Sequence, residues 1–264
     1  MSPELESWYD ALWQDFLRHC PSARKIHAVL GGGAPIINDH IALRTFARPG
    51  IDLAACGAQL QALGYREGGQ YHFAAKRLDA LHFEHPEPGV PKVFISELRL
   101  ADCSAGLNRI VDELLAGLGP ADSPGFMHAG RHWAVSQQDY RSLLAESEYA
   151  AWLAAFGFRA NHFTVDVNQL PGFDSVAAVN ARLRAEGFAL NASGGEIKGS
   201  PEVLLEQSSI LADEVEVEFS DGAASIPACF YEFAFRYPQL DGRLYQGFVE
   251  ASADKIFEST DVRR

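Results

Sequence analysis

The feature that most constrains the fold is a pair of similar segments in which a histidine opens an alternating run of β-branched and aromatic residues. The first is Asn38–Phe46 (NDHIALRTF) and the second is Asn161–Val167 (NHFTVDV). Alternation with a period of two is typical of a half-buried β-strand. Because His40 and His162 stand at the start of equivalent strands, the chain is predicted to contain a duplicated structural module.

The same succession of patterns follows each histidine. An apolar helical pattern comes next, over Leu53–Leu63 in the first copy and Val176–Leu183 in the second, and each is closed by a glycine and an aromatic residue. Strand-like segments then lead to a glutamate, which is Glu97 in the first copy and Glu232 in the second. This succession predicts two βαβββ units and an α+β fold.

A single domain over residues 1–264 is expected, with a helical layer inserted between the two modules. Its expected parts are an N-terminal helix and linker (1–35), module one (36–100), a helical insertion (101–160), module two (161–237) and a C-terminal closing segment (238–264). Apolar residues at helical spacing predict helices over Met1–His19, Ala105–Leu118 and Gln138–Phe156, whereas Leu244–Val249 has the pattern of a further strand.

The composition is that of a soluble globular protein and limits the partners. Hydrophobic residues make up 47% of the chain and charged residues 22%, with a formal net charge of −13. This charge argues against a nucleic-acid or anionic-membrane surface, since both attract clustered Lys and Arg. No apolar run approaches the roughly 20 residues of a membrane span. The four cysteines (Cys20, Cys56, Cys103 and Cys229) include no C-x-x-C pair, so a reducing, cytoplasmic location is expected.

Strand alternation decides which polar side chains share a face of the sheet. It places Arg44 on the face of His40 and Arg236 on the face of Glu232. Two imidazoles and one carboxylate from three separate strands, with the other coordination positions open, are the ligands of a non-haem Fe(II) oxygenase. The competing explanations are a hydrogen-bonded core role for each histidine and a salt bridge between Glu232 and Arg236.

Longer motifs make the chain resemble a known family. They are NDHIALRTF (38–46), NHFTVD (161–166), GGEIKGSP (194–201), LLEQSS (204–209), YEFA (231–234), YQGFV (245–249) and KIFESTD (255–261). These motifs are similar to those of the family once labelled DUF1338, whose characterised members are 2-oxoadipate dioxygenase/decarboxylases, also called hydroxyglutarate synthases. The resemblance runs from residue 36 to residue 261. It implies a half-barrel fold related to the vicinal-oxygen-chelate (glyoxalase-like) superfamily.

The resemblance also implies roles for individual residues. It matches His40, His162 and Glu232 to the family's metal ligands, and Arg44 to its substrate-carboxylate arginine. The implied enzyme uses Fe(II), takes a 2-oxo acid and O2 as its small-molecule partners, and converts 2-oxoadipate to 2-hydroxyglutarate plus CO2 in lysine catabolism. Arg44 lies ~13 Å beyond His40 along the strand at ~3.3 Å per residue, a gap that suits a short diacid. The alternative for Arg44 is an ion pair with a core carboxylate such as Asp166.

Two other classes of function remain open at this point. A glyoxalase-type lyase or isomerase would use the same fold with Zn²⁺ or Ni²⁺, and Glu97, as the counterpart of Glu232 in module one, would be its fourth ligand. A non-enzymatic small-ligand-binding protein of the same superfamily would need no metal. The sequence leaves open the roles of Lys198, Gln207 and Ser208, as well as the oligomeric state.

Overall fold

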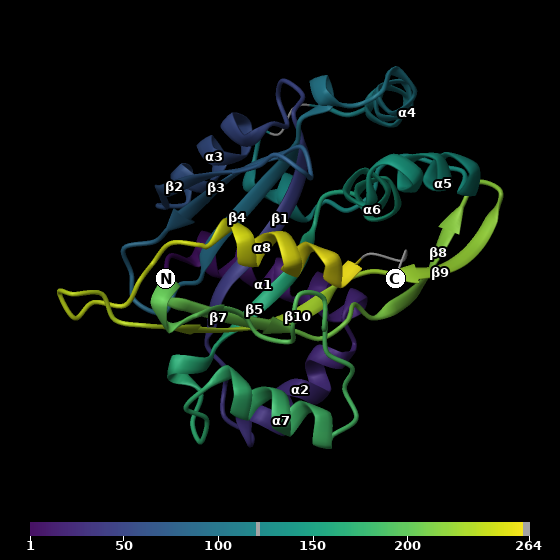
Figure 1. Ribbon diagram of the computed structural model, residues 1–264. Helices are drawn as coiled ribbons and strands as arrows, with labels where there is room; N and C mark the ends of the chain where they lie inside the picture. Colours follow the sequence, from purple (N-terminus) through teal and green to yellow (C-terminus); the bar gives the residue numbers. More distant parts are fainter. Residues whose placement is uncertain (120–121, 261–264) are drawn as a thin grey trace.

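The computed structural model describes residues 1–119 and 122–260 and consists of one large curved sheet with helices on both sides (Figure 1). The helices are α1 (Pro3–His19), α2 (Ser22–Gly31), α3 (Leu53–Ala62), α4 (Ala105–Leu115), α5 (Gln137–Glu146), α6 (Glu148–Phe156), α7 (Val176–Ala185) and α8 (Glu250–Ile256), and the last is continued by a 3₁₀ turn, η5 (Phe257–Thr260). The strands are β1 (Asn38–Phe46), β2 (Arg66–Phe73), β3 (Leu78–Glu84), β4 (Lys92–Leu98), β5 (Ala160–Asp166), β6 (Lys198–Ser200), β7 (Leu205–Ser209), β8 (Glu214–Phe219), β9 (Gly222–Pro227) and β10 (Phe230–Arg236).

The main sheet has two halves with the same strand arrangement. Its order is β2-β3-β4-β1-β5-β10-β7-β6, so β1 and β5 lie at the centre. They are antiparallel to each other, and each has a parallel neighbour on its outer side, β4 beside β1 and β10 beside β5. Each half therefore has the order of a βαβββ unit, and the predicted α+β half-barrel is confirmed. In the second half, the hairpin β8–β9 is inserted before the last strand.

Alternate residues of the central strands pack against helices on the outer face of the sheet. Phe163 of β5 and Tyr231 of β10 are fully buried and contact the aromatic side chains of α1, among them Trp13 and Phe16. This amphipathic helix begins at Ser2, whose hydroxyl accepts a hydrogen bond from the Leu5 amide. The helix predicted over Met1–His19 is confirmed. The residues between these core positions point to the inner face of the sheet.

Two helices cover the inner face. Helix α6 is buried along its length, and its Tyr149 hydroxyl donates to the Ser96 carbonyl oxygen of β4. Helix α8 crosses the sheet and contacts β2 at one edge and β6 and β7 near the other (Figure 1). These helices and the curvature of the sheet enclose the region in front of the strands β1, β5 and β10.

Two local predictions differ from the structure. The helix expected over Gln138–Phe156 is two helices, because Ser147 ends α5 and its hydroxyl caps α6 by accepting from the Ala150 amide. The strand expected over Leu244–Val249 is reduced to an isolated antiparallel bridge between Leu244 and Pro238. The carbonyl groups of Tyr245 and Gly247 accept hydrogen bonds from the Arg236 side chain.

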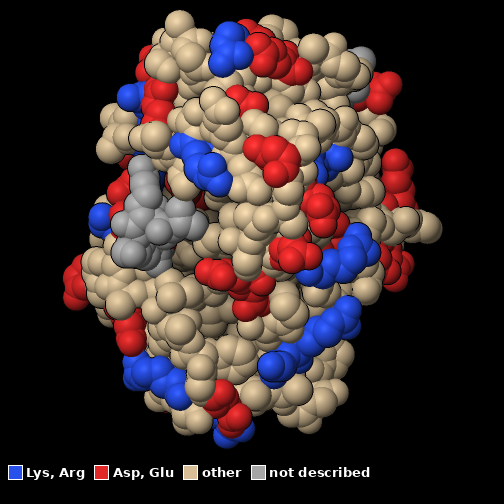
Figure 2. All heavy atoms as spheres, turned by 90° about the vertical axis from the view of Figure 1, so that its right-hand side faces the viewer, with Lys and Arg blue, Asp and Glu red and all other residues tan. Residues whose placement is uncertain are grey.

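The charged side chains on the surface and the length of the helices limit what the protein could bind. On the face shown in Figure 2, Lys and Arg side chains lie among Asp and Glu side chains. Within residues 1–119 and 122–260, no helix combines the length and the apolar character that a bilayer crossing requires.

Candidate metal centre

Three side chains predicted as metal ligands converge on the inner face of the sheet. His40, His162 and Glu232 come from β1, β5 and β10, which are neighbours in the sheet, and one ligand atom from each lies within 4.8 Å of the others. All three are buried, with exposed fractions of 2%, 5% and 0%. A single first-row metal ion can therefore reach all three.

Strand register explains this convergence. Ala42 of β1 lies opposite His162 of β5, and Phe230 of β10 lies opposite His162 from the other side. Side chains two residues apart on a strand point to the same face of the sheet. His40, two residues before Ala42, and Glu232, two residues after Phe230, therefore share a face with His162. The small side chain of Ala42 leaves room for the imidazoles.

Each histidine is oriented by the polar residue that precedes it. His40 Nδ1 lies 2.7 Å from Asp39 Oδ1, and His162 Nδ1 lies 3.0 Å from Asn161 Oδ1. Because a carboxylate and an amide oxygen only accept, both Nδ1 atoms donate, and in a neutral ring this leaves the lone pair on Nε2. His40 Nε2 accepts from the Thr164 hydroxyl at 3.1 Å. The sequence prediction missed Asp39 and Asn161 as partners, although a polar residue before both histidines was visible.

Glu232 supplies a buried anion with one unsatisfied oxygen. Its Oε1 accepts from Gln207 Nε2 at 2.5 Å, whereas Oε2 has no hydrogen-bond donor among the described residues and lies 3.1 Å from His162 Nε2. Burial raises the pKa of Glu232, but the two imidazoles and the Gln207 amide outweigh burial and hold the pKa below its ordinary value. Burial also lowers the pKa of His162. Two imidazole rings and a carboxylate with one unpaired oxygen are a donor set that fits a divalent metal.

The space in front of these ligands is small and has mostly apolar walls. A cavity of about 20 Å³ is lined by His40, Phe94, His162, Gln207, Glu232, Phe248, Ala253, Ile256 and Phe257. This volume is room for about one water-sized body. Phe257 also lines a second cavity of about 230 Å³, which is bordered by Lys76, Arg77 and Glu148. Phe257 thus forms part of the wall of both cavities.

Arg44 lies on the inner face of β1 but does not line the small cavity. Its guanidinium donates to Glu148 Oε1 and to Thr260 Oγ1, both at 3.1 Å. It also lies over the rings of Tyr149 and Trp152, 4.8 and 4.9 Å from their centroids. Its ion pair is therefore with a glutamate of α6.

The alternative partners considered for Arg44 and Glu232 lie elsewhere. Asp166 accepts hydrogen bonds from the Gln169 side chain and the Asn168 amide. Arg236 pairs with Asp39 through two contacts of 2.6 and 2.8 Å. Neither residue forms the ion pair that the sequence had suggested for Arg44 or Glu232.

Glu97 is not near the three ligands. Its Oε2 accepts from the Leu53 amide at the start of α3, on the outer face of the sheet. Lys92 of β4 lies opposite His40, and Phe230 of β10 lies opposite His162. Because Glu232 comes two residues after Phe230, its counterpart in β4 comes two residues after Lys92 and is Phe94. The pairing of Glu97 with Glu232 was wrong because it matched glutamates by order along the chain and not by strand register.

The structure shows the contacts of Gln207, Ser208 and Lys198, whose roles the sequence left open. Gln207 donates to Glu232 and belongs to the site. Ser208 faces away from it and donates to Asn180 Oδ1 at 2.6 Å. Lys198, paired with Gln207 across the sheet, donates to the Asn191 carbonyl oxygen.

Comparisons with known proteins cover most of the chain. A family model described as 2-oxoadipate dioxygenase/decarboxylase matches residues 20–118 and 125–243. A chloroplastic protein of the same description from Arabidopsis thaliana is 33% identical over 254 residues, which are 84% of this chain and 67% of the plant protein.

Solved structures show the same fold. A protein from Shewanella frigidimarina NCIMB 400, named as a candidate hydrolase, is 52% identical with a TM-score of 0.91 and covers 95% of this chain and 100% of its own. Hydroxyglutarate synthase from Oryza sativa, in complex with 2-oxoadipate, is 31% identical with a TM-score of 0.91 over 97% of this chain and 91% of its own. A candidate glyoxalase-superfamily protein from Ralstonia eutropha JMP134, 23% identical with a TM-score of 0.78, covers 92% of this chain and 85% of its own, which confirms the glyoxalase-like fold.

Proposed function

The chain belongs to the 2-oxoadipate dioxygenase/decarboxylase family, and we propose that it converts a 2-oxo diacid to the 2-hydroxy diacid one carbon shorter, with Fe(II) held by His40, His162 and Glu232. The observation that carries this proposal is the convergence of two imidazole lone pairs and an unpaired carboxylate oxygen in one buried cavity. For 2-oxoadipate, the products are 2-hydroxyglutarate and CO2, and the two oxygen atoms of O2 balance the reaction. The substrate supplies all the electrons.

The ligand set favours this chemistry. A bound Fe(II) ion would supply the site for O2 and polarise the chelated 2-oxo acid. Three protein ligands leave the other positions of an octahedral ion open for the substrate and O2. Asp39 and Asn161 keep the two imidazole rings aimed at the ion. Phe94 and Phe248, which line the cavity, exclude bulk water from it.

We assign the distal carboxylate of the diacid to Arg44, whose planar guanidinium is suited to bidentate recognition of a carboxylate. A cavity that holds about one water does not hold a six-carbon diacid. Substrate binding therefore requires the C-terminal turn to move, so that Phe257 and Thr260 leave the guanidinium and the small cavity joins the outer pocket. The substrate carboxylate would then take the place of the Thr260 hydroxyl on Arg44.

The glyoxalase-type alternative has lost its proposed fourth ligand, since Glu97 lies on the outer face.

A reducing compartment such as the cytosol is proposed because the described structure leaves all four cysteines as free thiols. Lysine catabolism is the proposed setting, because 2-oxoadipate is the substrate in the names of the relatives.

Oxygen consumption tests the proposed function. Fe(II)-reconstituted protein should consume O2 and release CO2 in equal amounts with one or more C4 to C7 2-oxo diacids. Variants His40→Ala and His162→Ala should do neither. Turnover of the same diacids without O2 would refute the dioxygenase assignment and favour a lyase or isomerase.

A further inference from the structure

The segment between β10 and α8, residues 237–249, forms part of the wall of the metal cavity. This segment, here called the strap, is held to the sheet by side chains at its inner end. Arg236 Nη1 donates to the Tyr245 and Gly247 carbonyl oxygens at 2.9 and 2.8 Å, and the Phe248 amide donates to the Tyr71 hydroxyl at 3.1 Å. Phe248 is thereby placed with its ring 4.8 Å from that of His40, centroid to centroid.

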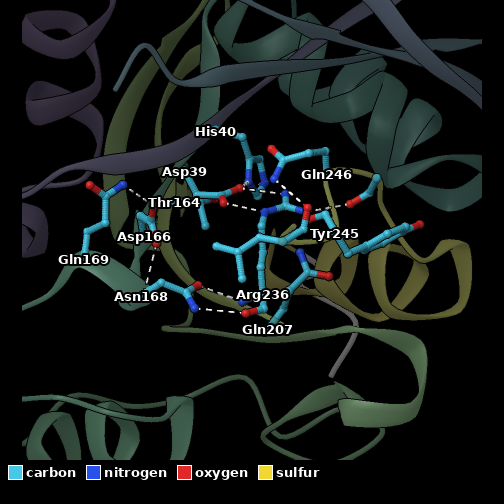
Figure 3. A network of polar contacts seen from close by, with 12 residues as sticks. Asp39, His40, Thr164, Asp166, Asn168, Gln169, Gln207, Arg236, Tyr245 and Gln246 are labelled. Atoms are coloured by element: carbon cyan, nitrogen blue, oxygen red, sulfur yellow. Dashed lines mark hydrogen bonds and ion pairs between the residues drawn. The ribbon is translucent and has the colours of Figure 1, made fainter. Parts of the chain in front are cut away.

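Arg236 also contacts the residue that orients His40. The side chain is 2% exposed, and its Nε and Nη2 donate to the two oxygens of Asp39 at 2.6 and 2.8 Å. Asp39 Oδ1 is the same atom that accepts from His40 Nδ1. Figure 3 shows the chain of contacts from Tyr245 through Arg236 and Asp39 to His40.

The geometry of the guanidinium matters for this connection. Two guanidinium nitrogens bind the carboxylate of Asp39, and the third reaches two carbonyl oxygens. The guanidinium carbon Cζ lies 5.2 Å from the Phe248 ring centroid. A lysine ammonium carries the same charge but has three donors on one atom, so it does not hold Asp39 and the strap in fixed relation.

We propose that Arg236 is a positioning residue that couples the seating of the strap to the orientation of His40 for metal binding. The inference rests on the proposed function only in requiring that His40 binds a metal. When the strap packs against the sheet, its carbonyl groups hold the Arg236 guanidinium in place. Arg236 then holds the Asp39 carboxylate, which orients the His40 ring. Because coupling between two sites is reciprocal, metal binding also stabilises the seated strap.

Metal affinity and hydrogen exchange test the coupling without measuring turnover. Zn²⁺ affinity is measured by chelator competition, and amide exchange of residues 244–249 is measured with and without Zn²⁺. In the wild-type protein, Zn²⁺ should slow exchange in this segment. Arg236→Lys should lower Zn²⁺ affinity by roughly 10- to 100-fold, the usual effect of losing a group that orients a metal ligand, and should remove the metal-dependent protection.

Two further variants separate coupling from general destabilisation. Arg243→Lys, in the same strap, changes an exposed arginine that contacts Asp241, and it should behave as the wild type in both measurements. Tyr71→Phe removes an anchor of the strap without touching Asp39 or His40, and it should also lower Zn²⁺ affinity. This second variant tests the inference even if Arg236→Lys does not fold.

The outcomes distinguish the coupling from the metal centre itself. Wild-type protein that binds Zn²⁺ without slowing strap exchange, or an Arg236→Lys variant with wild-type affinity, would overturn the coupling and leave the metal centre intact. Unchanged affinity in Tyr71→Phe would do the same. Wild-type protein that binds no metal would overturn the proposed metal centre, and the coupling with it.

Discussion

Replacing Glu232 with glutamine should separate metal binding from fold stability. The carboxylate is fully buried, and within residues 1–119 and 122–260 its Oε2 has no hydrogen-bond donor. The carboxamide introduced by Glu232→Gln can still accept from Gln207 and can donate to the His162 Nε2 lone pair, 3.1 Å away from Oε2 in the wild type. The carboxamide can replace both contacts but gives up the attraction that holds the pKa of Glu232 below its ordinary value, so without added metal the variant should stay within about 1–2 kcal/mol of the wild type in stability.

Added metal should separate the stabilities of the two proteins. At a metal concentration 100 times Kd, binding to the native state adds about 2.7 kcal/mol to the free energy of unfolding. For a domain of this size that corresponds to a rise in Tm of about 5–10 °C. The wild type should show this rise with Zn²⁺ or Fe(II), whereas Glu232→Gln should show none.

The assay is thermal unfolding of both proteins with and without metal under anaerobic conditions. Glu206→Gln is the matched control, because Glu206 lies on neighbouring β7 and accepts from the Tyr237 hydroxyl, outside the ligand cluster. It should respond to metal as the wild type does. An equal metal-induced rise in Glu232→Gln, or a large loss of stability in its metal-free form, would refute the assignment of Glu232 as a metal ligand.

Three further predictions concern residues around the ligands. Arg44→Lys should cost a few kcal/mol of transition-state stabilisation for a 2-oxo diacid and little for its monoacid analogue, while the metal content stays normal. Equal losses in kcat/KM for both substrates would rule out that Arg44 binds the distal carboxylate. Burial raises the pKa of Asp39, but Arg236 outweighs burial and holds this pKa well below its usual range. Asp39 therefore contributes stability that is present above about pH 4 and is lost as the pH falls through the lower pKa of the folded protein. Urea unfolding at a series of pH values should show that Asp39→Asn weakens this loss of stability at acid pH. Phe257→Ala should open the wall between the two cavities and lower KM for the diacid, and an unchanged KM would contradict the required movement of the C-terminal turn.

The central strands and the face on which the two histidines lie were predictable because their signals are local. Alternation over nine residues in β1 and seven in β5 is readable without tertiary information, and it sets the face on which His40 and His162 lie. Alternation within its own segment and the family resemblance indicated Glu232, whereas the position of β10 beside β5 is known only from the structure.

Features that depend on long-range packing were not predictable. The ion pair of Arg44 joins residues 104 positions apart, and no periodicity in β1 or α6 indicates it. The error over Glu97 has a similar cause, because register between β1 and β4 follows from packing and not from the spacing of acidic residues. Leu244–Val249 has a strand pattern, but its Tyr245 and Gly247 carbonyl groups accept from Arg236, a residue of another element.

The most direct test of the proposed reaction is turnover of 2-oxoadipate by the Fe(II)-reconstituted protein under ¹⁸O2, with mass spectrometry of both products. The CO2 derives from the carboxyl group next to the keto carbon and carries that group's own oxygens, so atom balance places both atoms of O2 in the 2-hydroxy diacid. The account predicts doubly labelled 2-hydroxyglutarate and unlabelled CO2. Unlabelled 2-hydroxy diacid, or turnover that proceeds without O2, would contradict it.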